Sequence, residues 1–226
     1  MIVPAMTEQE IRKEMLNDIK NLRPKVENFQ RKFRAVVLRT SKFPACRFYE
    51  CLTEKKNLFV VGFTADRRGQ HSTPNLGMHC VYERPEGKYA AVWTYSGRMI
   101  LFPPHFFDRY QERVLKDVTL SRIDVIRQYL KNNPGQAGLE INDDVEAVFK
   151  CFEGHYSDEV ISLVFATSQG YCFGENHGDV TVMKTIITED MLSDRQRQLF
   201  PAIRELFIQS HKNIYGSKWI PSDNVL

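Results

Sequence analysis

Hydrophobic positions near the start of the chain recur with the period of an α-helix. The apolar stripe with this spacing consists of Ile11, Met15, Ile19 and Leu22. Thr7 and Glu10 have the spacing of a capping box, in which two side chains satisfy free backbone N–H groups at a helix start. Pro24 lacks a backbone N–H, so we expect it to kink or restart the helix. The pattern predicts an N-terminal helix over residues 7–39.

From about residue 45 the period changes, and short segments rich in β-branched and aromatic residues alternate with turn-like clusters. The predicted strands are 45–53, 57–64, 77–83, 88–95 and 98–103. Most of the connections between them are short, which favours an antiparallel meander. The exception is the polar loop at 65–76.

A helical pattern returns after the meander. Pro103 and Pro104 end the last strand and start a helix that reaches about residue 116, since proline is tolerated in a first helical turn. A second helix is expected at about 121–132, with Ile123, Ile126 and Leu130 facing the core. Further strand candidates are 145–152, 159–167, 170–174 and 179–187, and a closing helix is expected at 194–213.

These patterns predict an α+β protein. Its parts are an N-terminal helix, an antiparallel β-meander, a central helical pair, a second four-stranded antiparallel sheet and a C-terminal helix. The natural division falls near residue 97, giving a helix-plus-meander subdomain at 1–97 and an α-α-β-β-β-β subdomain with its closing helix at 98–226. The two are expected to pack together, because no linker rich in Gly, Ser or Pro separates them.

Composition narrows the class of protein. Hydrophobic residues make up 42 % and charged residues 26 % of the chain, as in an ordinary globular protein. A net charge of +3 does not by itself indicate a protein that binds nucleic acid. The five cysteines lack CxxC spacing, so we expect reduced thiols and a cytoplasmic location. The charged N-terminus is unlike a signal sequence, and no window approaches the roughly 20 apolar residues of a membrane span, so no membrane partner is expected.

Candidate chemistry is concentrated in the helix at 104–116. His105, Arg109 and Arg113 lie four residues apart, so they share one side of the helix while aromatic residues occupy the other. Two guanidiniums can hold a phosphate with paired hydrogen bonds, and an imidazole can exchange a proton near neutral pH. The alternative is structural: the arginines pair with neighbouring acidic residues, and the histidine is an ordinary first-turn residue.

The strand at 179–187 carries a second candidate. Alternation points Thr181 and Thr185 one way and Lys184 the other, with the aliphatic residues Val182 and Ile186. A lysine in such company indicates either an edge strand or a cation directed into a cleft. The remaining histidines fit turns or lack carboxylate partners, so no metal is expected. The sequence also lacks nucleophile-elbow, phosphate-loop, dinucleotide and zinc-protease motifs.

Residues 104–187, read as two helices followed by four antiparallel strands, resemble the barnase/EndoU/RelE-like group of metal-independent ribonucleases. The spacing of His105, Arg109 and Arg113 is similar to the His–Arg helix of compact toxin-like members. Lys184 and Thr185 lie on the terminal strand, where that group places polar catalytic residues. The resemblance implies RNA as substrate and no cofactor. It assigns proton transfer to the histidine, phosphate binding to the arginines, and supporting roles to Lys184 and Thr185.

Two other functions stay open at this point. One is a non-catalytic interaction module of a phage, mobile element or regulatory system, whose helices bind a partner protein. Its support is the near-neutral charge, the many aromatic residues and the missing catalytic signatures. The other is a DNA-binding protein that uses the basic stretch at 31–39, although this stretch lacks a helix-turn-helix partner. The sequence does not determine the oligomeric state.

Overall fold

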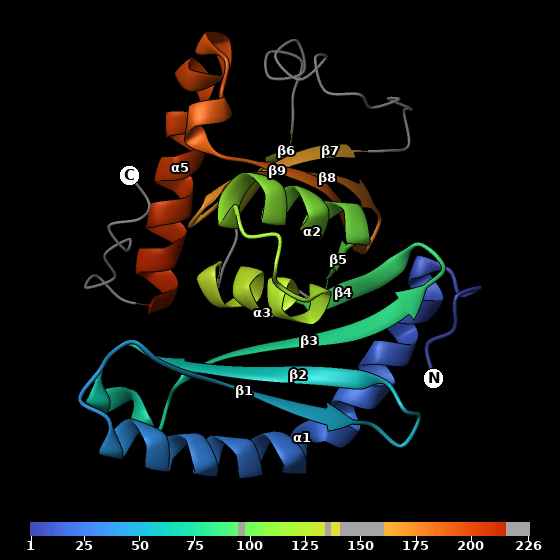
Figure 1. The fold of residues 1–226 in the computed structure, drawn as a ribbon, viewed down its shortest axis with the longest axis vertical. Coiled ribbons are helices and arrows are strands. Elements are labelled where there is room, and N and C mark those ends of the chain that lie inside the picture. Colours follow the sequence, from blue (N-terminus) through green and yellow to red (C-terminus); the bar gives the residue numbers. More distant parts are fainter. Residues whose placement is uncertain (95–97, 134–136, 141–160, 216–226) are drawn as a thin grey trace. The chain divides into compact units, whose positions relative to one another are not determined.

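The structure is a computed structural model that describes residues 1–94, 98–133, 137–140 and 161–215 (Figure 1). The chain forms two compact units, Met1–Leu101 and Phe102–Leu226. Each unit combines helices with β-strands, so the α+β class and the N-terminal helix are confirmed. No helix in the described part of the chain has the length and hydropathy needed to cross a bilayer.

The N-terminal helix α1 runs over Glu8–Arg39 without interruption. The predicted capping box is present: the Thr7 hydroxyl accepts from the backbone N–H of Glu10, and the Glu10 carboxylate accepts from the backbone N–H of Thr7. The predicted restart at Pro24 does not occur. Pro24 lies on the exposed side of the helix, where water can satisfy the carbonyl that loses its hydrogen bond.

The strands of the first unit follow the predicted meander. They are β1 (Ala45–Leu52), β2 (Leu58–Ala65), β3 (Asn75–Arg84), β4 (Gly87–Trp93) and, at the unit boundary, β5 (Met99–Phe102). Strands β1 to β4 pair antiparallel in chain order. The predicted polar loop contains the short 3-10 helix η1 (Arg68–His71).

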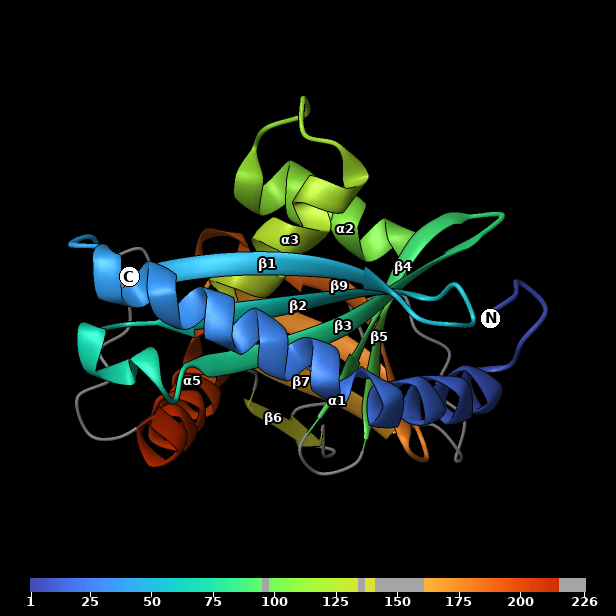
Figure 2. The same cartoon turned by 90° about the horizontal axis from the view of Figure 1, so that it is seen from below.

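Helix α1 lies along the sheet of the first unit, as Figure 2 shows. Its Phe33 and Val37 are fully buried against Val61 and Phe63 of β2. Farther toward the N-terminus the same helix buries Asp18, whose carboxylate accepts hydrogen bonds from Thr53 at 3.0 Å and from Asn57 at 2.6 Å. Apolar packing and buried hydrogen bonds therefore both hold α1 on the sheet.

The second unit begins with helices and continues with strands. Its helical elements are α2 (Pro104–Tyr110), the π-helical turn η2 (Gln111–Leu115), α3 (Arg122–Asn132), the 3-10 turn η3 (Glu189–Met191) and α5 (Asp194–Tyr215). Its strands are β6 (Ala137–Glu140), β7 (Ile161–Thr167), β8 (Gly170–His177) and β9 (Val180–Ile187). They pair antiparallel in the order β9-β8-β7-β6. The sequence did not predict β6, and the predicted strand at 145–152 lies outside the described residues.

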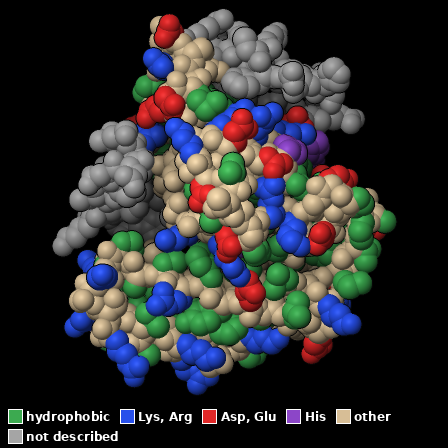
Figure 3. Space-filling model, viewed as in Figure 1, with side chains coloured by type: hydrophobic (Ala, Val, Ile, Leu, Met, Phe, Trp, Pro, Cys, Tyr) green, Lys and Arg blue, Asp and Glu red, His purple; other side chains and the backbone are tan. Residues whose placement is uncertain are grey.

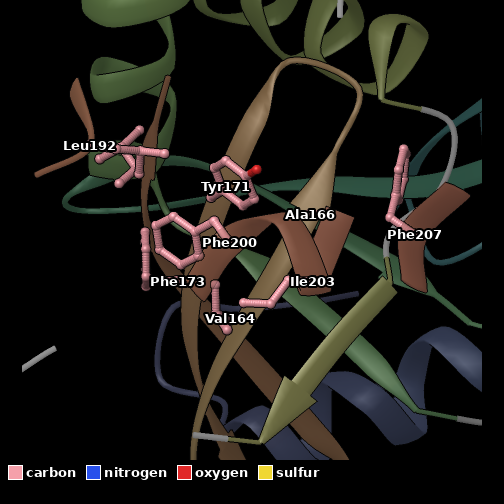
Figure 4. Packing of buried hydrophobic residues seen from close by; sticks show 9 residues of the cluster. Val164, Ala166, Tyr171, Phe173, Leu192, Phe200, Ile203 and Phe207 are labelled. Carbon is pink, nitrogen blue, oxygen red and sulfur yellow. The ribbon is translucent and has the colours of Figure 1, made fainter. Parts of the chain in front are cut away.

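The strands of the second unit are covered on both faces. Figure 4 shows one cluster, formed by Val164, Ala166, Tyr171, Phe173 and Ile187 with Leu192, Phe200, Ile203 and Phe207. Cys172 lies between Tyr171 and Phe173 in β8, so its side chain points to the opposite face. There its Sγ lies 3.5 Å from the hydroxyl of Tyr129 on α3. Helix α5 therefore packs on one face and α3 on the other.

The buried face of α3 differs from the prediction. Ile126 is fully buried as expected, but the other buried positions are Val125 and Tyr129, while Ile123 and Leu130 are only half-buried. The ring of Tyr129 lies 5.1 Å from that of Phe102, measured between centroids. Aromatic packing therefore turns the helix by about one position from the orientation that its aliphatic residues alone predict.

Candidate functional site

Helix α2 is oriented by aromatic side chains on its buried face. Phe106 and Tyr110 are fully buried, and their ring centroids lie 5.0 and 5.1 Å from that of Tyr129 in edge-on geometry. Aromatic pairs favour this arrangement because the positive edge of one ring meets the negative face of the other. The packing leaves His105 and Arg109 on the exposed side of the helix.

Arg113 connects the end of this helix to strand β9. It lies in the π-helical turn η2, a type of turn that is frequent at functional sites. Its Nη1 donates hydrogen bonds to Thr185 Oγ1 at 3.0 Å and to the carbonyl oxygen of Ile186 at 2.9 Å. Burial lowers the pKa of the Arg113 guanidinium, and the positive charge of Arg109 lowers it further. Arg113 thus fixes the helix against β9.

Lys184 lies at an irregular point in the pairing of β8 with β9. Phe173 is opposite Thr185 and Gly174 is opposite Met183, so Lys184 is the extra residue of a β-bulge. Bulges locally change the direction of a side chain, and they occur often beside active sites. The bulge places the lysine in solvent.

The bulge also explains why the predicted alternation of β9 is wrong at this point. Lys184 was expected to share a face with Ile186, yet Lys184 is exposed and Ile186 is buried. Glycine permits the local geometry, because a Cβ on Gly174 would lie only 2.8 Å from the carbonyl oxygen of Val182.

The ammonium of Lys184 has an acidic partner on the neighbouring strand. Its Nζ lies 2.9 Å from Glu175 Oε2. The same carboxylate oxygen lies 3.7 Å from Nε2 of His177. Neither Glu175 nor His177 was among the predicted site residues, and His177 was assigned to a turn. One signal was available: the spacing Glu175-x-His177 puts both side chains on one face if the segment is a strand.

His105 lies beside Lys184. Surrounding protein atoms exclude water from part of the imidazole, and this desolvation is the main cause that lowers the pKa of His105. The positive charge of Lys184 is the next largest cause, while a hydrogen bond with the backbone of Lys184 acts in the opposite direction. The imidazole is therefore neutral at neutral pH and can accept a proton.

Arg109 is also exposed, and like Lys184 it has an acidic partner. Its Nη1 lies 3.3 Å from Glu112 Oε2, one helical turn away. Asp108 pairs instead with Arg122 of α3. Asp117, another acidic residue close to the arginines in the sequence, accepts hydrogen bonds from the backbone and hydroxyl of Thr119. The structural alternative, in which the arginines pair with neighbouring acidic residues, thus accounts for Arg109 and not for Arg113.

Within the second unit, the five predicted site residues lie where α2 and η2 contact strand β9. His105, Arg109 and Arg113 come from α2 and η2, and Lys184 and Thr185 come from β9. We call these five residues, with Glu175 and His177 of β8, the α2–β9 cluster. The cluster contains two imidazoles, three cations and the carboxylate of Glu175, and the carboxylate of Glu112 lies beside Arg109. Such a set can hold an anion and move a proton to or from it.

Comparisons with known proteins supply no family for this chain: no protein-family model, no curated protein and no solved structure matches it. Within the described residues, no group of three or more His, Cys, Asp or Glu side chains could hold a metal ion. The geometry of the α2–β9 cluster therefore carries the functional argument alone.

Proposed function

We propose that the α2–β9 cluster binds RNA and cleaves its phosphodiester bonds without a metal ion. The observation that carries this proposal is the position of His105 beside Lys184. A neutral imidazole next to a fixed positive charge can accept a proton while the charge stabilises a nearby phosphate. The order of two helices and then antiparallel strands in the second unit is also that of the ribonuclease group that the sequence resembles.

In the proposed reaction the 2′-hydroxyl of RNA attacks the adjacent phosphorus. Its proton passes to His105, the bond from the 2′-oxygen to phosphorus forms, and the bond from phosphorus to the 5′-oxygen breaks. The leaving oxygen takes a proton from water, and the hydroxide left behind takes the proton from His105, which returns to its neutral form. The products are a 2′,3′-cyclic phosphate and a 5′-hydroxyl, so the atoms balance without a cofactor.

The cations have different roles in this proposal. Arg109 and Lys184 are exposed, and each can exchange its carboxylate partner for a phosphate. Arg113 already uses Nη1 for Thr185 and Ile186. We therefore assign Arg113 and Thr185 to positioning, with the remaining guanidinium nitrogens of Arg113 directed to phosphate oxygens.

The test is an RNA-cleavage assay in excess chelator with the wild-type protein, His105→Ala and Lys184→Ala. The exposed Lys131→Ala variant on α3 is the matched control. Wild type and control should produce 2′,3′-cyclic phosphate ends, and His105→Ala should lose roughly 10²–10⁴-fold in rate, as expected for a proton-transfer group. The proposal fails if wild type does not exceed a buffer blank or if His105→Ala cleaves at the wild-type rate.

A protein-interaction module is the second candidate. The observation that favours it is charge compensation, because Arg109, Lys184 and Arg122 each have a carboxylate partner within the second unit. A surface of mixed charge suits a partner protein better than a polyanion. Absence of RNA cleavage, together with capture of a defined partner that Arg109→Glu abolishes, would favour this function.

A further inference from the structure

The first unit has a shallow hollow between the middle of α1 and the 3-10 helix η1. Its volume is about 310 Å³, and it is lined by Glu27, Gln30, Arg31, Arg34, His71 and Ser72. This is the lower end of the size range of small-molecule sites, which begins at roughly 300 Å³. The hollow therefore accommodates a small group or one segment of a longer ligand.

The helix side of the hollow follows from residue spacing. Glu27 is followed by Gln30 and Arg31 after three and four residues, and these are followed by Arg34 after four and three residues. This spacing puts all four side chains on one side of α1. The amide of Gln30 donates a hydrogen bond of 3.0 Å to the carbonyl oxygen of Ser72. This bond connects α1 to the end of η1 and keeps the hollow's two walls together.

The charges in the hollow are mostly uncompensated and positive. The carboxylate of Glu27 is occupied by Arg23, whose Nε lies 3.1 Å from Oε1. Arg31 and Arg34 form no ion pair or hydrogen bond with any residue in the described part of the chain. Figure 3 shows Lys and Arg side chains gathered over the α1 and η1 region at the bottom of the view. The hollow thus attracts anions.

His71 adds a second feature that points to a ligand. Its Nδ1 is buried from solvent and has no hydrogen-bond partner among the residues described. Buried polar atoms are normally hydrogen-bonded, since leaving one unpaired costs free energy. His71 lines the hollow, so a rotation of its ring would allow this nitrogen, in the tautomer that carries a proton there, to donate to an anion bound in the hollow.

We propose that this hollow binds a phosphate group, carried either by a polynucleotide backbone or by a small phosphorylated molecule. Arginine side chains match phosphate oxygens with two parallel hydrogen bonds, and two unpaired arginines flank the hollow. A bare phosphate fits the volume, and anything attached to it extends into solvent. The site belongs to the first unit, so it does not depend on RNA cleavage at the α2–β9 cluster.

The test titrates the full-length protein by calorimetry with inorganic phosphate, adenosine monophosphate and a short 2′-O-methyl RNA that cannot be cleaved through its 2′-oxygen. The test variant is Arg31→Ala/Arg34→Ala. The matched control is Lys13→Ala/Lys20→Ala, which removes the same charge from exposed positions of the same helix. Alanine is a good helix former, so both variants should fold, and a melting curve checks this. Arg34→Gln is a second test variant with a smaller perturbation.

The double arginine variant should weaken binding by at least about tenfold, because a charge-assisted hydrogen bond is typically worth more than the free energy of a tenfold change. The lysine control should bind like wild type. Only binding that the double arginine variant loses is assigned to the hollow, because the α2–β9 cluster is also proposed to bind RNA. Loss of RNA binding alone identifies a polynucleotide backbone as the source of the phosphate, and loss of small-anion binding alone identifies a small phosphorylated molecule. If none of the probes binds, or if the folded arginine variants bind as tightly as the control, the proposal is overturned.

Discussion

The guanidinium of Arg113 donates a hydrogen bond of 3.0 Å to the hydroxyl of Thr185, and so joins the end of the α2 helix to strand β9. A second bond from the same nitrogen reaches the carbonyl of Ile186 at 2.9 Å. Arg109, on the same side of the helix, makes only an exposed pair with Glu112 at 3.3 Å. Two arginines that look equivalent in the sequence therefore differ in their structural roles.

The first prediction follows from this difference. Arg113→Ala should lower the free energy of unfolding by about 1–3 kcal/mol, since it removes two charge-assisted hydrogen bonds from a half-buried site. Arg109→Ala should change it by less than about 0.5 kcal/mol, as is usual for an exposed side chain. Urea unfolding of both variants and of Thr185→Val measures the effect. Equal stabilities of the two arginine variants would contradict the assigned roles.

The second prediction concerns the titration of His105. The charge of Lys184 disfavours the protonated imidazole, so Lys184→Ala should raise the pKa of His105 toward its ordinary value. If the neutral imidazole is the base in RNA cleavage, the acid limb of the rate profile should move to higher pH in this variant. NMR titration of the ring protons measures the pKa directly.

The control for this experiment is Lys131→Ala, which removes an exposed lysine of the same unit. Its titration curve for His105 should superimpose on that of the wild type. A His105 pKa that stays unchanged in Lys184→Ala would show that the two side chains do not interact in solution, and would remove the observation on which the ribonuclease proposal rests.

Local sequence signals were sufficient for much of the fold. The capping box of Thr7 and Glu10 marked the start of α1, and alternation of apolar residues placed most of the strands within two residues of their ends. Strand β6 was missed because it is short and because Ala, Gly and Glu, three of its four residues, are uncommon in strands. The long strand β3 extends two residues before its predicted start, into sequence that reads as polar loop.

The candidate site was predictable only as far as it depends on one element. Four-residue spacing on a helix is a local property, so His105, Arg109 and Arg113 were found together. The roles of Glu175 and His177 depend on which strand pairs with β9, and the exposure of Lys184 depends on a bulge in that pairing. Register between strands is set by contacts distant in sequence, and a single sequence does not contain it explicitly.

The third prediction concerns the cysteines. Cys46, Cys51, Cys80 and Cys172 are free thiols in the structure, and the sequence predicts that Cys151, outside the described residues, is also reduced. Thiol titration of denatured, non-reduced protein should therefore find five free groups. A lower number would show that a disulfide exists and would contradict the prediction of a reducing compartment.

Labelling of the native protein should separate the four described thiols. Cys46 and Cys51 are half-buried, whereas Cys80 and Cys172 are fully buried. Burial raises the pKa of Cys172 to about 12, so almost no reactive thiolate exists there at neutral pH. In a Cys151→Ser variant, a maleimide should label Cys46 and Cys51 in the native protein. Cys80 and Cys172 should become labelled only when the protein is unfolded. Rapid labelling of Cys172 in the native protein would contradict its buried position.

The last prediction concerns His79, a buried histidine of β3. Its Nε2 has no hydrogen-bond partner among the described residues, and burial lowers its pKa from 6.5 to about 3. Below pH 6.5 the unfolded chain binds a proton that the folded protein excludes, so stability is lost as pH falls toward the folded-state value. The linkage slope approaches about 1.4 kcal/mol per pH unit, which amounts to about 2 kcal/mol between about pH 7 and about pH 5. Over this pH range His79→Leu should lose about 2 kcal/mol less stability than the wild type, because it lacks the titrating imidazole while the carboxylates titrate alike in both proteins. Urea unfolding at the two pH values gives the difference, and parallel pH dependence of the two proteins would show that His79 is protonated in the folded state.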